Sequence, residues 1–283
     1  MGGTSTVPAP MPDDAPRVAG GADSHKGVSR RVNEDSWCCS RLVFAVADGM
    51  GGHAGGATAS AHAIASLRQL SGQSLTPNDL VRAIQSANTV ILDSAQSQAG
   101  LQGMGTTLAG LALVLDGEHD LWLAFNIGDS RIYRLSGGRL TQLSVDHSVV
   151  QELLDLKEIT PAQAATDPRR NVVTRALGGD AVAEVDFWLL PPEAGERFLL
   201  CSDGVTGALS DESLERVLVA HADPRDAARA VVIAATEAGT QDDATAVVVD
   251  TETAARVDQG HRTATVERAV LDQSDTQRDG ARQ

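Results

Sequence analysis

Three apolar segments of this chain end at an aspartate beside a glycine, and such side chains are suited to binding a metal ion. The segments are LVFAVADG, LWLAFNIGDS and RFLLCSDG, and their aspartates are Asp48, Asp129 and Asp203. A fourth acidic pair, Asp242 and Asp243, precedes the apolar run TAVVV. Strands that are apolar throughout are buried on both faces, so their acidic ends lie where a sheet meets water and can converge.

Converging carboxylates repel one another unless a cation lies between them. Aspartate and backbone carbonyl oxygens suit magnesium, manganese or calcium, whereas zinc and copper favour imidazole or thiolate. The sequence therefore predicts a hard-metal site. Any one strand that ends in Asp-Gly is more typical of a turn, and only the joint occurrence favours metal ligands.

Length and composition favour one large domain. The chain has 283 residues, 42% of them hydrophobic, and apolar segments recur from about Val28 to Asp250. We predict a disordered leader over residues 1–18, one domain over 19–250, and a polar, mostly disordered tail over 251–283 with a short helical segment at Val266–Leu271. No signal peptide and no apolar run of membrane-spanning length is visible, which predicts a cytoplasmic protein without a membrane span.

Charge and cysteine content exclude several function classes. The formal net charge of −15 disfavours binding to nucleic acid or acidic lipid. The cysteines Cys38, Cys39 and Cys201 form neither an even framework nor a CxxC pair, so we expect them to be reduced and structural.

The elements that would position the acidic residues follow from periodicity. Helices are predicted after Gly55-Gly56 and after Thr76-Pro77, where a cap precedes a proline. Strand patterns follow, and we expect them to form an antiparallel meander with a turn at Ser136-Gly137-Gly138. Those strands cover Thr106–Leu115, Leu121–Ile127, Arg131–Leu135 and Arg139–Leu143.

The second half begins with a weaker pattern over 146–175, which contains a predicted helix at His147–Glu158 and a basic pair at Arg169-Arg170. We interpret it as a surface flap. Strands then resume, followed by two helices and a last strand; Gly239 is placed to end the second helix. The order predicts an α+β fold, an αββα sandwich of two antiparallel sheets flanked by helix pairs. The later elements are Glu184–Leu190, Arg197–Cys201, Ser210–His221 and Pro224–Ala238.

Six short motifs give the chain a resemblance to a known family. In order they are RRVNED (30–35), VADGMGGH (46–53), GTTL (105–108), IGDSRIY (127–133), LLCSDGV (199–205) and DDATAVVV (242–249). Together, across about residues 24–250, they resemble the metal-dependent serine/threonine protein phosphatases of the PP2C/PPM type, bacterial branch. The resemblance implies hydrolysis of phosphoserine and phosphothreonine in proteins with Mn²⁺ or Mg²⁺, two catalytic ions and a weaker position for a third.

The resemblance also implies roles for single residues. Asp48 would bridge the two catalytic ions and Gly49 would add its carbonyl oxygen, where the lack of a side chain lets the backbone approach. Asp203 and Asp242 would complete the first ion's ligands, and Asp129 would hold the third ion. Glu34 and Asp35 would act through water.

Arg30 would bind the substrate phosphate with its guanidinium fork, while Arg31 is a surface neighbour. The implied partner is a phosphorylated protein linked to a serine/threonine kinase system. No nucleic-acid partner is implied.

Two departures from the family pattern leave questions open. Met50 stands where eukaryotic members carry a histidine proposed to protonate the leaving alcohol, so a water on the metal or His53 could serve instead. Asp243 stands where asparagine is usual, and it could tighten metal binding or face solvent. His147 could face the substrate or start the flap helix.

Three other functions fit the sequence less well than a phosphatase does. A catalytically silent phosphatase-like binding module would fit the same fold, but no ligand position is lost. A phosphodiesterase or nuclease is disfavoured by the acidic balance. The run Gly49 to Ala54 matches a dinucleotide-binding fingerprint, but two helices in tandem follow it instead of the required strand.

Overall fold

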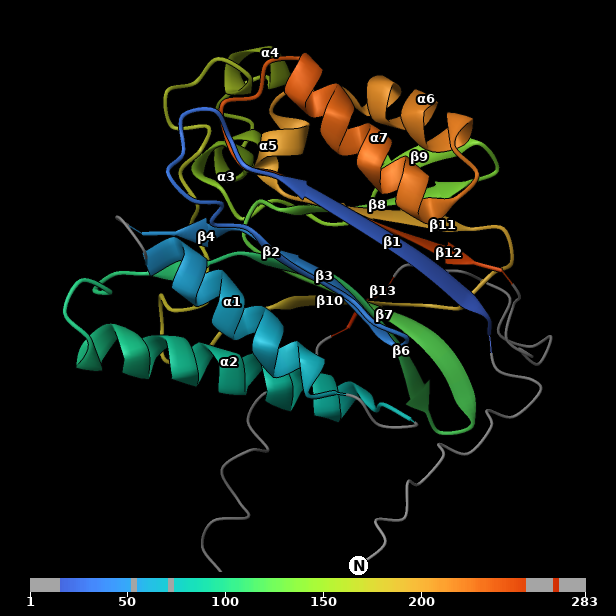
Figure 1. Ribbon diagram of the computed structural model, residues 1–283, viewed down its shortest axis with the longest axis horizontal. Helices are drawn as coiled ribbons and strands as arrows, with labels where there is room; N and C mark the ends of the chain where they lie inside the picture. The colour runs from blue at the N-terminus through green and yellow to red at the C-terminus, as the bar shows by residue number, and fades with distance from the viewer. Residues whose placement is uncertain (1–15, 52–54, 71–73, 253–266, 270–283) are drawn as a thin grey trace, which may run out of the picture.

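A computed structural model describes residues 16–51, 55–70, 74–252 and 267–269. Two antiparallel sheets pack face to face, and a helix pair covers the outer face of each (Figure 1). The αββα sandwich predicted from the sequence is confirmed. Most of the predicted leader and tail lies outside the described residues.

The first sheet has the strand order β1-β12-β11-β8-β9. Its edge strand β1 was not predicted, because its sequence VAGGADSH is small and polar. It nevertheless pairs with β12 along its whole length, with Val18 opposite Thr251 and His25 opposite Ala244. The strands are β1 (Val18–His25), β8 (Arg131–Ser136), β9 (Arg139–Gln142), β11 (Arg197–Cys201) and β12 (Ala244–Thr251).

The second sheet has the order β13-β10-β7-β6-β3-β2, and a two-strand sheet, β4-β5, lies beside it. Strands β7 and β8 belong to different sheets, so the predicted continuous meander is wrong: the chain crosses between sheets at Gly128–Ser130. The segment 267–269 is a strand on β10, so the helix predicted there is wrong. The strands are β2 (Ser36–Cys39), β3 (Val43–Ala47), β4 (Gly49–Met50), β5 (Gly105–Thr106), β6 (Leu108–Asp116), β7 (His119–Ile127), β10 (Asp186–Leu190) and β13 (Glu267–Ala269).

Helices α1 (Gly55–Arg68) and α2 (Pro77–Ser97) cover the second sheet, and α6 (Asp211–Ala220) and α7 (Pro224–Glu237) cover the first (Figure 1). All four were predicted: α2 begins at the predicted Pro77, and the bounds of α6 and α7 differ from the predicted ones by at most one residue. Helix α2 starts at a reciprocal capping box between Thr76 and Asp79. Gly239, with φ +91°, follows the end of α7. Within the described part of the chain, no helix is both long and apolar enough to cross a bilayer.

The predicted flap contains two short helices, α3 (Val149–Asp155) and α4 (Pro161–Ala164). Ser148, not His147, caps α3, since its hydroxyl accepts the amide of Gln151. The predicted helix at His147–Glu158 is therefore shorter at both ends. A further short helix that was not predicted, α5 (Asp203–Thr206), starts at the end of β11.

Aromatic side chains join the two sheets in the core. Trp122 on β7 contacts Phe44 on β3 and Phe198 on β11 edge to face, with ring centroids 6.3 and 5.9 Å apart. Its indole N–H donates to the Thr251 hydroxyl on β12 at 3.1 Å. Packing of this kind fixes how one sheet lies on the other.

Candidate active site

Acidic residues from both sheets meet at one end of the sandwich. Asp48 follows β3 in the second sheet, and Asp35 precedes β2, whose first residue pairs with the last residue of β3. Asp203 follows β11 and Asp242 precedes β12, which are neighbours in the first sheet. The strand ends predicted from the sequence to converge are thus brought together.

The backbone of Asp48 is held by two threonines. The Asp48 amide donates to the Thr107 hydroxyl at 2.9 Å, and its carbonyl accepts from the Thr107 amide at 2.9 Å and the Thr106 hydroxyl at 2.8 Å. Thr106 and Thr107 of the Gly-Thr-Thr segment therefore have a structural role. Gly49 lies so close to the start of α1 that a Cβ there would be 2.2 Å from the Gly56 carbonyl oxygen.

Asp129 lies on the turn that crosses between the sheets. Gly128 makes this turn with φ +102°. Its amide donates to His147 Nδ1 at 3.1 Å, and the other ring nitrogen of His147 lies 3.3 Å from Asp186. His147 is buried by these contacts, so it supports the Asp129 turn and does not face the substrate.

Burial and mutual repulsion raise the pKa values of the clustered carboxyl groups. Burial raises the pKa of Asp48 well above its ordinary value, and Asp35, Asp203 and Asp129 raise it further. Burial, with Asp203 and Asp146 nearby, raises the pKa of Asp129 to about 7. Similar causes raise the pKa of Asp35 to about 7 and that of Asp203 above its ordinary value. Burial and repulsion thus disfavour the charged form of each of these groups, and a nearby cation would offset that effect.

Arg30 makes direct contacts with two acidic residues of this site. Its Nε and Nη2 donate to the two oxygens of Asp242, both at 2.7 Å, and its Nη1 donates to Glu34 at 3.0 Å. The hydrogen bonds to Asp242 raise the pKa of Arg30 above its ordinary value. The fork that was expected to bind phosphate thus holds a predicted metal ligand, a contact that was not anticipated.

The donor set fits a hard divalent cation. Three carboxylate oxygens are buried without a hydrogen-bond partner: Glu34 Oε1, Asp35 Oδ1 and Asp203 Oδ1. Buried charge without a partner is costly, and a cation would satisfy it. Among the described side chains, no three His, Cys, Asp or Glu groups already form a ligand cage. Asp242, one of the predicted ligands, has both of its carboxylate oxygens on the Arg30 guanidinium.

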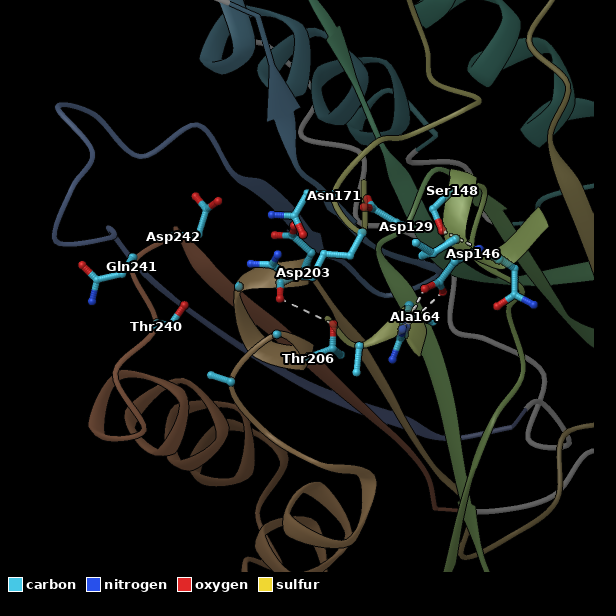
Figure 2. Close-up of a pocket in the computed structure, with 18 of the residues that line it drawn as sticks. Asp129, Asp146, Ser148, Ala164, Asn171, Asp203, Thr206, Thr240, Gln241 and Asp242 are labelled. Carbon is cyan, nitrogen blue, oxygen red and sulfur yellow. Dashed lines mark hydrogen bonds and ion pairs between the residues drawn. The ribbon is translucent and has the colours of Figure 1, made fainter. Parts of the chain in front are cut away.

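A cavity of about 1110 Å³ opens over the cluster. Asp129, Asp203 and Asp242 border it, and the flap supplies the facing wall, with Ser148, Ala164 and Asn171 (Figure 2). Residues of the predicted flap therefore line the cavity. No histidine is among the described residues that line the cavity. His53, considered as an acid for the leaving group, lies outside the described residues.

Two supporting residues, Ser202 and Asp146, were missed by the sequence analysis, and the role of a third, Asp243, was left open. The Ser202 hydroxyl donates to Asp35 Oδ2 at 2.7 Å and so joins the two sheets beneath the cluster. Asp146 holds Arg131 with both oxygens and lies near Asp129. Asp243 is buried and does not face solvent, which excludes one of the two roles considered for it. The partner of Ser202 lies 167 positions away in the chain, and only the position of Ser202 directly before Asp203 was a signal.

Comparison with known proteins gives a family match over residues 24–231, described as protein phosphatase 2C. The serine/threonine protein phosphatase PstP of Mycobacterium tuberculosis is 38% identical over 232 residues, which cover 81% of this chain and 44% of PstP. The chain thus spans less than half the length of that relative. The serine/threonine phosphatase stp of Listeria monocytogenes is 35% identical over 237 residues, 80% of this chain and 92% of stp.

Solved structures agree with the sequence match. The catalytic domain of PstP in complex with two manganese ions superposes with a TM-score of 0.74 at 34% identity. The match covers 84% of this chain and all of that domain.

Proposed function

The chain belongs to the protein phosphatase 2C family, and from this we propose that it hydrolyses phosphoserine and phosphothreonine in proteins with the help of divalent metal ions. The observation that carries the proposal is the buried cluster of carboxylates drawn from both sheets, with three oxygens that lack a partner. A silent binding module would not need so much like charge in one place.

Asp48, the Gly49 carbonyl, Asp203 and Asp242 would hold two ions, Mn²⁺ or Mg²⁺, with Glu34 and Asp35 acting through water and Asp129 at a third position. Bound ions of this kind activate a water molecule as the nucleophile by lowering its pKa, and they neutralise charge on the transferring phosphoryl group.

The chain's own residues supply the remaining functions. Arg30 would exchange one partner for another, since a guanidinium fork matches two phosphate oxygens as well as it matches the carboxylate of Asp242. The flap would cover the flanking peptide and exclude water. Thr107 and Ser202 would keep Asp48 and Asp35 in place, through the hydrogen bonds given above.

We also propose that the substrate is a phosphoprotein of a serine/threonine kinase system and that the protein acts in the cytoplasm. The relatives named as serine/threonine phosphatases support the phosphoprotein part of this proposal.

The test is release of phosphate from a phosphothreonine peptide and from para-nitrophenyl phosphate, with Mn²⁺ and with EDTA. Turnover with Mn²⁺ that EDTA abolishes is expected. Asp203→Ala should remove it, while Asp116→Ala, at the exposed end of β6, should not. Binding of the phosphopeptide without any turnover would favour the binding module, and cleavage of an oligonucleotide would favour a nuclease; either result overturns the proposal.

A further inference from the structure

Asp243 joins two distant parts of the chain through both of its carboxylate oxygens. Its side chain is 2% exposed. The amide of Gly27 donates to Oδ1 at 2.8 Å, and the amide of Glu34 donates to Oδ2 at 2.7 Å. The two amides are the two ends of one loop, and Arg30 lies between them in the sequence.

The loop is also held from within and along its side. Lys26 Nζ donates to the Arg30 carbonyl at 2.6 Å, and the Arg30 amide donates to the Gly27 carbonyl at 3.2 Å. The Ser29 hydroxyl donates to the Gln241 carbonyl at 2.8 Å. A Cβ on Gly27 would lie 2.4 Å from that same carbonyl oxygen, so the loop is pressed directly against the segment that leads into β12.

The charge of Asp243 has a cost that its position must offset. It stands next to Asp242 and raises the pKa of Glu34. Two short hydrogen bonds from backbone amides to a carboxylate are charge-assisted and offset such a cost. An amide side chain of the same shape would accept from only one of the two N–H groups, because its NH₂ group would face the other donor.

We propose that Asp243 is a positioning residue: its carboxylate fixes the loop that carries Arg30 and Glu34 against the strand that carries Asp242. The proposal rests on the proposed function, because Arg30 matters only if it receives a phosphate. It assigns Asp243 a mechanical role through Arg30, in place of a direct role in attracting metal.

The first experiment is amide hydrogen exchange on the metal-free protein, which needs no activity. Asp243→Asn and Asp243→Ala are compared with Asp116→Asn, which removes the same charge at the exposed end of β6. Faster exchange is expected at one of the two amides, Gly27 or Glu34, in Asp243→Asn and at both in Asp243→Ala, with no change in Asp116→Asn. Unchanged exchange at these two amides would overturn the proposal. Because Asp243→Asn keeps the shape of the side chain, it remains informative if Asp243→Ala does not fold.

The second experiment distinguishes the proposed positioning of the Arg30 loop by Asp243 from an effect of the Asp243 charge on metal binding. In Asp243→Asn, KM for a phosphothreonine peptide should rise about tenfold, equivalent to about 1.4 kcal/mol, with a much smaller change in kcat. In an Arg30→Ala background the same substitution should add little, because both act through one group. A rise only in the Mn²⁺ concentration needed for half-maximal activity, or full additivity with Arg30→Ala, would overturn the proposal. Inactive wild-type protein would instead refute the proposed function. The hydrogen-exchange result would still show whether Asp243 positions the Arg30 loop.

Discussion

Arg30 and Asp242 form a two-pronged ion pair in which both carboxylate oxygens accept hydrogen bonds at 2.7 Å. A residue expected to bind substrate therefore holds a residue expected to bind metal. If Arg30 binds phosphate and Asp242 binds metal, as proposed above, filling the site with both requires this pair to separate or to be shared. Metal binding and substrate capture would then be coupled through Arg30.

Arg30→Ala should have opposite effects on the two ligands. Loss of the fork should raise KM for a phosphopeptide roughly tenfold or more, the effect of losing hydrogen bonds between charged groups. It should also lower the dissociation constant for Mn²⁺ measured by calorimetry, because Asp242 is released. Arg31→Ala, at an exposed position next to it, is the control and should change neither. Weaker Mn²⁺ binding in Arg30→Ala would contradict the coupling.

Asp48→Asn should abolish turnover and yet stabilise the metal-free protein. The substitution removes a buried carboxylate whose pKa is raised by burial and by its acidic neighbours. In EDTA we expect Tm to rise by about 2–4 °C, the shift that about 1 kcal/mol produces in a domain of this size. Scanning calorimetry with EDTA and with Mn²⁺ measures both effects. A lower Tm of Asp48→Asn than of the wild type in EDTA would show that burial and acidic neighbours do not destabilise the Asp48 carboxylate.

The metal-free protein should lose stability as pH rises from about 4 to 7. The pKa values of Asp35 and Asp129 are raised to about 7 in the folded state. Across this window the folded state keeps protons that the unfolded state has released, so the free energy of unfolding falls with rising pH. Tm in EDTA should therefore be higher at pH 5.5 than at pH 7.5, and Mn²⁺ should raise Tm more at pH 7.5. The double variant Asp35→Asn, Asp129→Asn should flatten the trend; an unflattened slope would assign it to other groups.

Arg170 and Arg169 should differ in their effect on peptide substrates. Arg170 lines the cavity, whereas Arg169 is turned to Asp167, which accepts from its Nε at 3.0 Å. Arg170→Ala should raise KM for phosphopeptides severalfold while leaving para-nitrophenyl phosphate nearly unaffected, because that small substrate has no flanking residues. Arg169→Ala serves as the matched control. Equal effects of the two substitutions on peptides would mean that the flap contributes only general positive charge.

Much of the fold could be predicted because its elements are locally marked. The apolar strands, the Thr76-Pro77 start of α2 and the glycine after α7 each carry their own signal. Strand β1 carries none: its burial comes from β12 and α7, more than 200 residues away in the chain. The sheet change between β7 and β8 was also hidden, because apolar alternation does not reveal which sheet a strand joins.

The candidate site divides in the same way. The acidic strand ends were recognisable, and the structure places Asp48, Asp129, Asp203 and Asp242 near one another, while their roles as ligands remain predictions. The contacts of Arg30 with Asp242 and of Asp243 with Gly27 were not recognisable. Each links residues more than 210 positions apart, and no local pattern tells a carboxylate which distant donor it will meet.

The aromatic contact of Trp122 with Phe198 has a consequence for how this protein can evolve. One sheet contributes Asp48 and the other contributes Asp203, so the spacing of these carboxylates depends on how the sheets rest on each other. Substitutions in that interior layer, remote from the cavity, would slightly shift the distance between the two carboxylates. Natural variants could thus drift in their preference between manganese and magnesium without a change in any ligand.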